Sequence, residues 1–196
     1  YLLEYETKIS RAMFLADPDK EVEKDKAEHY WKDIETRAQR IPLQHITGEQ
    51  EFMGLDFKVN EHVLIPRQDT EILVEEAMRY LHDGMRILDL CTGSGCILLS
   101  LLHYSNDCEG VGVDISQEAL QVAAQNAELL GIRADFLKSD LYEKVTGKFD
   151  LLVSNPPYIE RAVIPTLMEE VREYDPYIAL DGGEDGLDFY RRIIGG

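Results

Sequence analysis

Basic residues are scarce in this sequence. Only 20 Lys and Arg residues stand against 38 Asp and Glu residues, which gives a formal net charge of −18. A charge of this sign repels the phosphate backbone of a nucleic acid wherever basic residues do not cluster locally. Nucleic acid is therefore a disfavoured partner.

Cysteines and long apolar runs are scarce as well. Cys91, Cys96 and Cys108 are odd in number and form no C-x-x-C pair, and no apolar leader precedes the first charged residue. We therefore expect neither a disulfide framework nor export, and no spacing of His and Cys predicts a metal site. No apolar run approaches the ~20 residues that a membrane-spanning helix needs. These absences predict a soluble protein of the cytoplasm that does not engage a membrane.

The order of patterns along the chain predicts three segments. The first 40 residues contain no Gly, and their apolar residues recur with a helical period that Pro18 is expected to divide into two helices. Residues 51–59 alternate apolar and polar side chains around Gly54, as a β-hairpin does. We thus expect a helical domain over 1–48, a hairpin linker over 49–66 and a larger domain over 67–196.

The larger domain is predicted to have α/β, Rossmann-like architecture. Its first helix is expected over 70–82, with one apolar face formed by Ile72, Leu73, Ala77 and Leu81. Short apolar strands then alternate with helices. The expected strands are 86–90, 110–114, 134–137 and 149–154, and the expected helices end near 104 and span 116–130. This alternation predicts a parallel sheet, which binds ligands at the carboxyl ends of its strands.

A glycine-containing loop follows the first of these strands. In residues 89–95 the glycines allow the backbone to approach a ligand closely, but Leu98 stands where a dinucleotide-binding motif has its third Gly. Asp114 ends the next strand, where an acidic side chain accepts hydrogen bonds from both hydroxyls of a ribose. The pattern favours a cofactor that has a free ribose diol and no pyrophosphate, with a purely structural turn as the alternative.

Three further residues near this loop admit two interpretations each. Asp140 follows the third strand and either flanks the edge of an adenine or caps a turn. Cys91 and Cys96 lie beside the glycines, and we interpret them as small buried hydrophobic residues rather than ligands.

The tetrapeptide Asn155-Pro156-Pro157-Tyr158 follows the fourth strand directly. Two successive prolines stiffen the loop and remove two backbone donors, so acceptors dominate it. The Asn155 side-chain oxygen and the Pro156 carbonyl can accept both protons of a planar NH₂ group, while the Tyr158 ring provides a flat wall. Asn155, Pro156 and Tyr158 are therefore the expected catalytic residues for chemistry at an amide or amine nitrogen.

With these motifs the chain resembles the HemK (PrmC) family of glutamine methyltransferases. The matching stretches are Pro42–Gly48, Glu51–Gly54, Val63–Arg67, Thr70-Glu71, Asp89–Gly95, Asn155–Tyr158 and Ala179–Gly183. The resemblance implies an N-terminal helical domain that recognises a peptide chain release factor, a hairpin, and a methyltransferase domain that uses S-adenosylmethionine and releases S-adenosylhomocysteine. Its substrate would be the glutamine of a Gly-Gly-Gln motif in a protein of translation termination.

The resemblance also implies site residues. Cofactor contacts are expected at Cys91, Thr92, Gly93, Ser94, Gly95, Asp114, Leu141 and Asn155, and substrate contacts at Asn155, Pro156, Pro157 and Tyr158. Asp89 and Asp140 complete the predicted cofactor contacts. Family members often carry an aromatic residue where this chain has Leu141, so adenine would rest on an aliphatic surface here. The resemblance also implies further strands beyond those predicted here, so we expect the sheet of this chain to be incomplete.

Two other functions fit parts of the same pattern. The N-P-P-Y tetrapeptide also holds the exocyclic amine of a flipped adenine in nucleic-acid methyltransferases. Such an enzyme should offer a basic surface beside its pocket, which the acidic residues around Asn155 argue against. They are Glu160, Glu169, Glu170, Glu173, Asp175, Asp181, Glu184 and Asp185. Alternatively, the chain binds S-adenosylmethionine without turnover, which a methyl-transfer assay would distinguish.

Overall fold

The computed structural model describes all residues from 1 to 196. The chain forms two compact units, Tyr1–Gly48 and Glu49–Gly196. No helix in the structure combines the length and the apolar character required to cross a bilayer.

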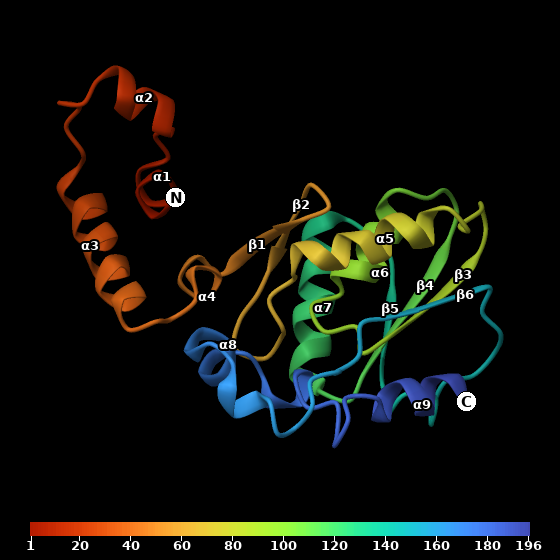
Figure 1. The fold of residues 1–196 in the computed structure, drawn as a ribbon. Coiled ribbons are helices and arrows are strands. Elements are labelled where there is room, and N and C mark those ends of the chain that lie inside the picture. The colour runs from red at the N-terminus through yellow and green to blue at the C-terminus, as the bar shows by residue number, and fades with distance from the viewer. The chain divides into compact units, whose positions relative to one another are not determined.

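The secondary-structure elements of both units are shown in Figure 1. The α-helices are α1 Leu2–Thr7, α2 Arg11–Ala16, α3 Lys24–Ala38, α4 Leu43–Thr47, α5 Glu71–Met78, α6 Cys96–His103, α7 Gln117–Leu130, α8 Glu169–Tyr174 and α9 Asp188–Ile194. The strands are β1 Glu49–Phe52, β2 Leu55–Lys58, β3 Arg86–Leu90, β4 Glu109–Asp114, β5 Asp135–Lys138 and β6 Leu151–Ser154. Short 3₁₀ turns lie at Gln68–Thr70, Ile164–Thr166 and Tyr177–Ala179.

The first unit consists of the helices α1 to α4. The prediction of two helices divided at Pro18 was wrong, because α1 and α2 are already separate before that proline. Lys8 ends α1 in the left-handed conformation at a φ of 57°, and the Ser10 side chain then caps α2 by accepting from the Met13 N–H. Inside the unit, the Tyr5 hydroxyl donates to the Thr47 carbonyl at 2.9 Å.

The hairpin predicted around Gly54 is confirmed, and it opens the second unit. β1 and β2 pair antiparallel, and the turn between them places Met53 and Gly54 at φ values of 53° and 71°. Phe52 and Phe57 are fully buried and meet edge to face, which attaches the hairpin to the main core. The Glu71 carboxylate accepts from the Met53 N–H at 2.8 Å and fixes the turn to α5.

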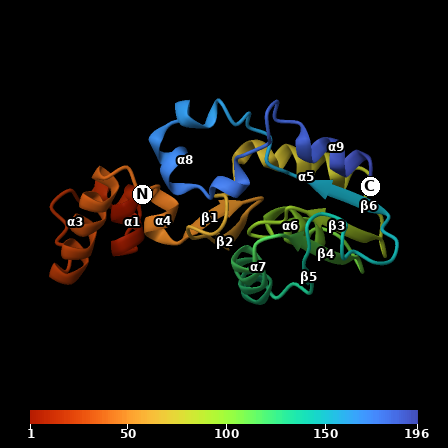
Figure 2. The ribbon, with the colours of Figure 1, turned by 90° about the horizontal axis from the view of Figure 1, so that it is seen from below.

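The four predicted strands of the α/β sheet are confirmed, and they lie in the order β5-β4-β3-β6, all parallel. Side chains alternate across the sheet, so Ile87 of β3 faces α5, α6 and α7, whereas Leu88 and Leu90 face α9. The sheet therefore lies between α5, α6 and α7 on one face and α9 on the other (Figure 1). The hairpin packs against α7 beside this sheet (Figure 2).

The structure corrects the predicted helix over 70–82. α5 ends at Met78, because the following N–H groups of Arg79 and Tyr80 bond only three residues back. The predicted face is confirmed at Leu73, Ala77 and Leu81, which lie in or against the main core, but it is wrong at one position. Ile72 is 66% exposed, whereas Val74 is completely buried in the main core.

This correction gives a stability prediction. Val74→Ala removes two buried methyl groups from the main core, so we expect the free energy of unfolding to fall by about 2 kcal/mol. Ile72→Ala is the matched control on the same helix and should change it by no more than about 0.5 kcal/mol. Urea unfolding followed by circular dichroism measures both values. Equal losses for the two variants would contradict the burial described for α5.

Candidate active site

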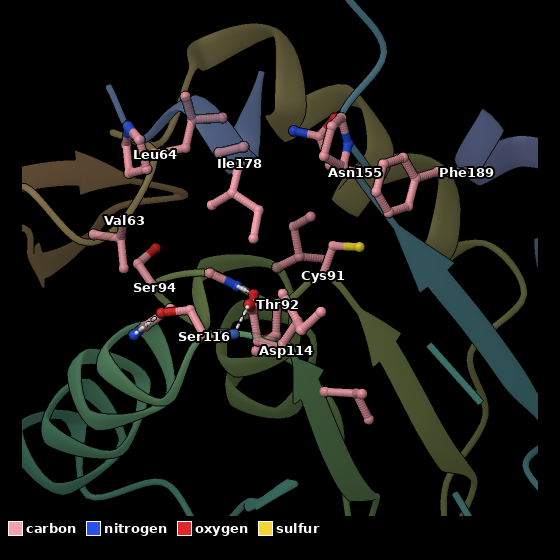
Figure 3. Close-up of a pocket in the computed structure, with 18 of the residues that line it drawn as sticks. Val63, Leu64, Cys91, Thr92, Ser94, Asp114, Ser116, Asn155, Ile178 and Phe189 are labelled. Atoms are coloured by element: carbon pink, nitrogen blue, oxygen red, sulfur yellow. Dashed lines mark hydrogen bonds between the residues drawn. The ribbon is translucent and has the colours of Figure 1, made fainter. Parts of the chain in front are cut away.

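A pocket opens at the carboxyl ends of β3, β4 and β6 (Figure 3). Strand β3 continues into the loop at Cys91, β4 ends at Asp114, and β6 leads directly to Asn155. These three residues line the same pocket although they are far apart in the sequence. Their proximity follows from parallel pairing, which brings the carboxyl ends of neighbouring strands to one edge.

The loop between β3 and α6 depends on left-handed backbone conformations. Cys91, Gly93 and Gly95 have φ values of 59°, 55° and 80°. A Cβ on Gly95 would lie 3.2 Å from the Cβ of Ala123, so this glycine also permits α7 to pack closely on the loop. The loop is closed by the Gly95 N–H, which donates to the Thr92 carbonyl at 2.8 Å. The backbone around the pocket is thus fixed from within the loop and by α7.

Asp114 holds this loop from the neighbouring strand. One carboxylate oxygen accepts from the Gly93 N–H and the other from the Ser116 N–H, each at 2.9 Å. A carboxylate has about four acceptor sites, so two remain for a ligand in the pocket. Burial raises the pKa of Asp114 above its ordinary value, while the backbone N–H groups of Ser116, Gly93 and Ile115 oppose that shift.

Asp89, which was predicted to contact the cofactor, lies beneath the loop and does not line the pocket. It is completely buried, and its carboxylate accepts from the Thr92 hydroxyl at 2.6 Å. Burial raises its pKa to about 7, and the nearby Asp114 carboxylate adds to the shift. Asp89 therefore supports Thr92, which does line the pocket.

The predicted residues after β5 also lie at the pocket. Asp140 accepts from Arg192 of α9 at 2.8 Å, so an ion pair with α9 forms part of this wall. Leu141 is buried and has a φ of 48°. Cys91 lies nearby as a free thiol, and burial raises its pKa to about 12, which keeps it protonated and unreactive at neutral pH.

Asn155, the first residue of the tetrapeptide, lies across the pocket from Asp114 (Figure 3). The Asn155 amide nitrogen donates to the Thr70 hydroxyl at 3.4 Å, which leaves the side-chain oxygen available as an acceptor. Pro156 and Pro157 are buried, and Pro157 lines the pocket. Tyr158 is 57% exposed and does not line it.

The backbone after Tyr158 is hydrogen-bonded to the backbone of residues 180–182. The Ile159 N–H donates to the Leu180 carbonyl, and the Gly182 N–H donates to the Ile159 carbonyl. A Cβ on Gly182 would lie 2.6 Å from the Cα of Tyr158, so only glycine permits this approach of two backbones. The end of the tetrapeptide is thereby fixed.

Several pocket residues were not predicted from the sequence. Val63, Leu64 and Ile178 give the pocket apolar walls, and Phe189 lies beside Asn155 (Figure 3). Arg67 also lines the pocket and pairs with the carboxylate of Asp175, whose side chain is only 1% exposed. Val63 and Arg67 belong to one of the stretches by which the sequence resembles a known family, but no role was predicted for either residue. No local pattern marks Ile178, Phe189 or Asp175, because each depends on the tertiary fold.

The structure therefore brings together most of the predicted site. The predicted residues that line the pocket are Cys91, Thr92, Gly93, Ser94, Asp114, Asp140, Leu141, Asn155 and Pro157. Those outside the lining are Asp89, Gly95, Pro156 and Tyr158.

The buried Asp89 gives a prediction on pH dependence. Its raised pKa means that the folded chain binds this proton more tightly than the unfolded chain does. Stability must therefore fall as the pH rises from the ordinary value of 3.8 to about 7, by up to about 1.4 kcal/mol per pH unit. Asp89→Asn removes the titration, so the difference in unfolding free energy between the two proteins isolates this carboxyl group.

The measurement is urea unfolding of both proteins at a series of pH values across this range. We expect the stability of the unaltered protein to decline relative to that of Asp89→Asn as the pH rises. A difference that stays constant would show that Asp89 has the same pKa in the folded and unfolded chains.

Comparison with known proteins identifies two family models along the chain. Residues 68–173 match the model of the methyltransferase small domain, and residues 1–48 match the PrmC N-terminal domain. Relatives named release factor glutamine methyltransferase, from Clostridium acetobutylicum and Moorella thermoacetica, are each 46% identical to this chain. They match 98% and 100% of it, and the matches cover 70% of each relative.

A relative of the same name from Geobacter sulfurreducens is 50% identical over 82% of this chain, and the match covers 57% of that relative. Among solved structures, the hMettl16 catalytic domain in complex with MAT2A 3′UTR hairpin 6 is similar, with a TM-score of 0.54. That likeness covers 73% of this chain and 56% of the other at 19% identity, and it shows the fold alone.

Proposed function

We propose that this chain, which belongs to the family of release factor glutamine methyltransferases, methylates the side-chain amide nitrogen of a glutamine in a peptide chain release factor. The methyl donor is S-adenosylmethionine. The observation that carries the proposal is that one pocket is lined both by the loop that Asp114 holds and by the free acceptor of Asn155. The methyl donor and the substrate amide can therefore meet within this pocket.

The residues around Asp114 fit the cofactor. Its two remaining acceptor sites suit the two hydroxyls of a ribose, and the left-handed loop at Gly93 lets backbone approach the ligand. The apolar surfaces of Leu141 and Ile115 suit an adenine, and both residues line the pocket. When bound, S-adenosylmethionine supplies an electrophilic methyl group on a sulfonium.

Asn155 and Pro156 position the nucleophile. An amide nitrogen is a weak nucleophile because its lone pair is delocalised into the carbonyl, so orientation must supply much of the rate enhancement, up to about 7–11 kcal/mol of the barrier in favourable cases. The Asn155 oxygen accepts one N–H proton and stabilises the positive charge that develops on nitrogen. We assign the second N–H proton to the Pro156 carbonyl, although Pro156 is buried and lies outside the pocket lining. The Thr70 hydroxyl holds the Asn155 amide in the orientation that presents this oxygen.

The charges around the pocket favour a protein substrate over a nucleic acid. Glu160, Glu169 and Glu173 are exposed in the segment that follows the tetrapeptide. The sequence-based count of surface acids included Asp175, which the structure shows to be buried and paired with Arg67. The arginines of this segment do not form a basic stripe, because Arg161, Arg172 and Arg191 each pair with a carboxylate. We place the reaction in the cytoplasm, in keeping with three free thiols.

The direct test supplies the chain with S-adenosylmethionine carrying a labelled methyl group. We expect label to enter a bacterial release factor and not a matched release factor whose Gly-Gly-Gln glutamine is replaced by Ala. Single-stranded and duplex DNA serve as alternative acceptors. Labelled nucleic acid would favour adenine methylation. Cofactor binding without methyl transfer to any acceptor would indicate a module that binds the cofactor without turnover.

The roles within the tetrapeptide predict a different outcome for each variant. Asn155→Ala removes an acceptor whose interaction strengthens as charge develops on nitrogen, so turnover should fall by about 10²- to 10³-fold, more than substrate affinity does. Tyr158→Phe keeps the ring face and should retain most activity, whereas Tyr158→Ala should lose much of it. Single-turnover methylation of the release factor measures all three. Near-normal turnover by Asn155→Ala, or equal losses for both Tyr158 variants, would refute the proposed amide clamp.

A further inference from the structure

A buried amide on α7, Asn126, lies at the end of the hairpin nearest the pocket. Its side chain is completely buried, and it makes three hydrogen bonds to backbone groups of two distant segments. The Lys58 N–H donates to its oxygen at 2.7 Å, and its nitrogen donates to the Lys58 carbonyl at 3.0 Å. The same nitrogen donates to the Ser94 carbonyl at 2.9 Å. Both of its N–H donors and its oxygen are therefore engaged.

The two segments that Asn126 joins both contribute to the pocket, and Val63 and Ser94 lie next to each other there (Figure 3). Ser94 belongs to the loop after β3 and lines the pocket. Lys58 does not line it, but it is the last residue of β2, and the chain that continues from it contributes Val63 and Leu64 to the pocket wall. Val59 and Val63 also pack against Ala119 and Val122 of α7, so this stretch follows the same helix.

The remainder of the hairpin is attached without Asn126. The Met53 N–H at the turn donates to Glu71 of α5, and the Met53 carbonyl accepts from the Tyr104 hydroxyl at 2.7 Å. Phe52 and Phe57 add apolar contacts with the main core. The hairpin therefore has attachments that do not involve Asn126, whereas Asn126 joins Lys58 to Ser94.

We propose that Asn126 is a positioning residue for the cofactor, which fixes the wall after β2 and the loop after β3 at the separation that the bound nucleoside requires. The role rests on the proposed function, since it presupposes that S-adenosylmethionine occupies this pocket. It acts through backbone groups and without contact to the cofactor, because Asn126 itself does not line the pocket.

The first test compares Asn126→Ala with Glu71→Ala by calorimetric titration with S-adenosylhomocysteine. Each variant removes one side chain that binds the hairpin backbone, but only Asn126 reaches the loop at Ser94. At a temperature at which both remain folded, we expect Asn126→Ala to raise the dissociation constant by about ten-fold or more. Glu71→Ala should change it by less than about two-fold.

The outcomes separate this role from the proposed function. Failure of the unaltered protein to bind S-adenosylhomocysteine would contradict the proposed function and this role with it. Binding by the unaltered protein with equal affinity in both variants would overturn the role of Asn126 alone.

A second test needs no substitution and remains decisive if Asn126→Ala does not fold. Amide hydrogen exchange is followed by NMR in the unaltered protein with and without S-adenosylhomocysteine. Because Asn126 connects Lys58 to the loop, binding should slow exchange of the Lys58 amide by about ten-fold. The Met53 amide is the matched control, since it is held by Glu71, and it should change little. Protection at Gly93 without protection at Lys58 would overturn the proposal.

Discussion

The site depends on the parallel pairing of β3 with β4 on one side and β6 on the other. The register places Leu90 beside Val113 and Ser154, so the chain leaves all three strands at one edge of the sheet. A slip of one residue would turn Leu88 and Leu90 away from α9 and move Asp89 out of its buried position. The hydrophobic alternation that buries this sheet is therefore also what aligns Asp114 with Asn155 across the pocket.

The sequence predicted those parts of the fold and site that have a local signature. Apolar runs between turns located the four parallel strands, and two glycines marked the loop that ends at Gly95. Ile72 was assigned to the buried face in place of Val74, since both are apolar and only the tertiary contacts decide which is covered. Asp175 was counted as a surface charge because nothing in its neighbourhood indicates Arg67, which lies 108 residues away. Ile178 and Phe189 were missed for the same reason.

Two acidic residues near the loop between β3 and α6 show that a position at the end of a strand does not by itself predict a contact with a ligand. Asp89 and Asp114 both lie at the carboxyl ends of strands, but the side chain of Asp114 reaches the pocket and that of Asp89 lies beneath the loop. Burial raises the pKa of both groups. It also raises the pKa of Asp175, although Arg67 opposes that shift. Three carboxyl groups in unfavourable surroundings make this end of the sheet costly to fold, as is common where a protein maintains a binding site.

Asn126 recognises peptide groups and no side chains, which has a consequence for the divergence of such proteins. Position 58 can accept any residue with a backbone N–H, and position 94 any residue that fits its buried place, without loss of the three hydrogen bonds. Proline at position 58 is excluded, since it has no N–H to donate. The outer surface of the hairpin is consequently free to change its chemistry over evolutionary time while the geometry around the methyl donor is inherited unchanged.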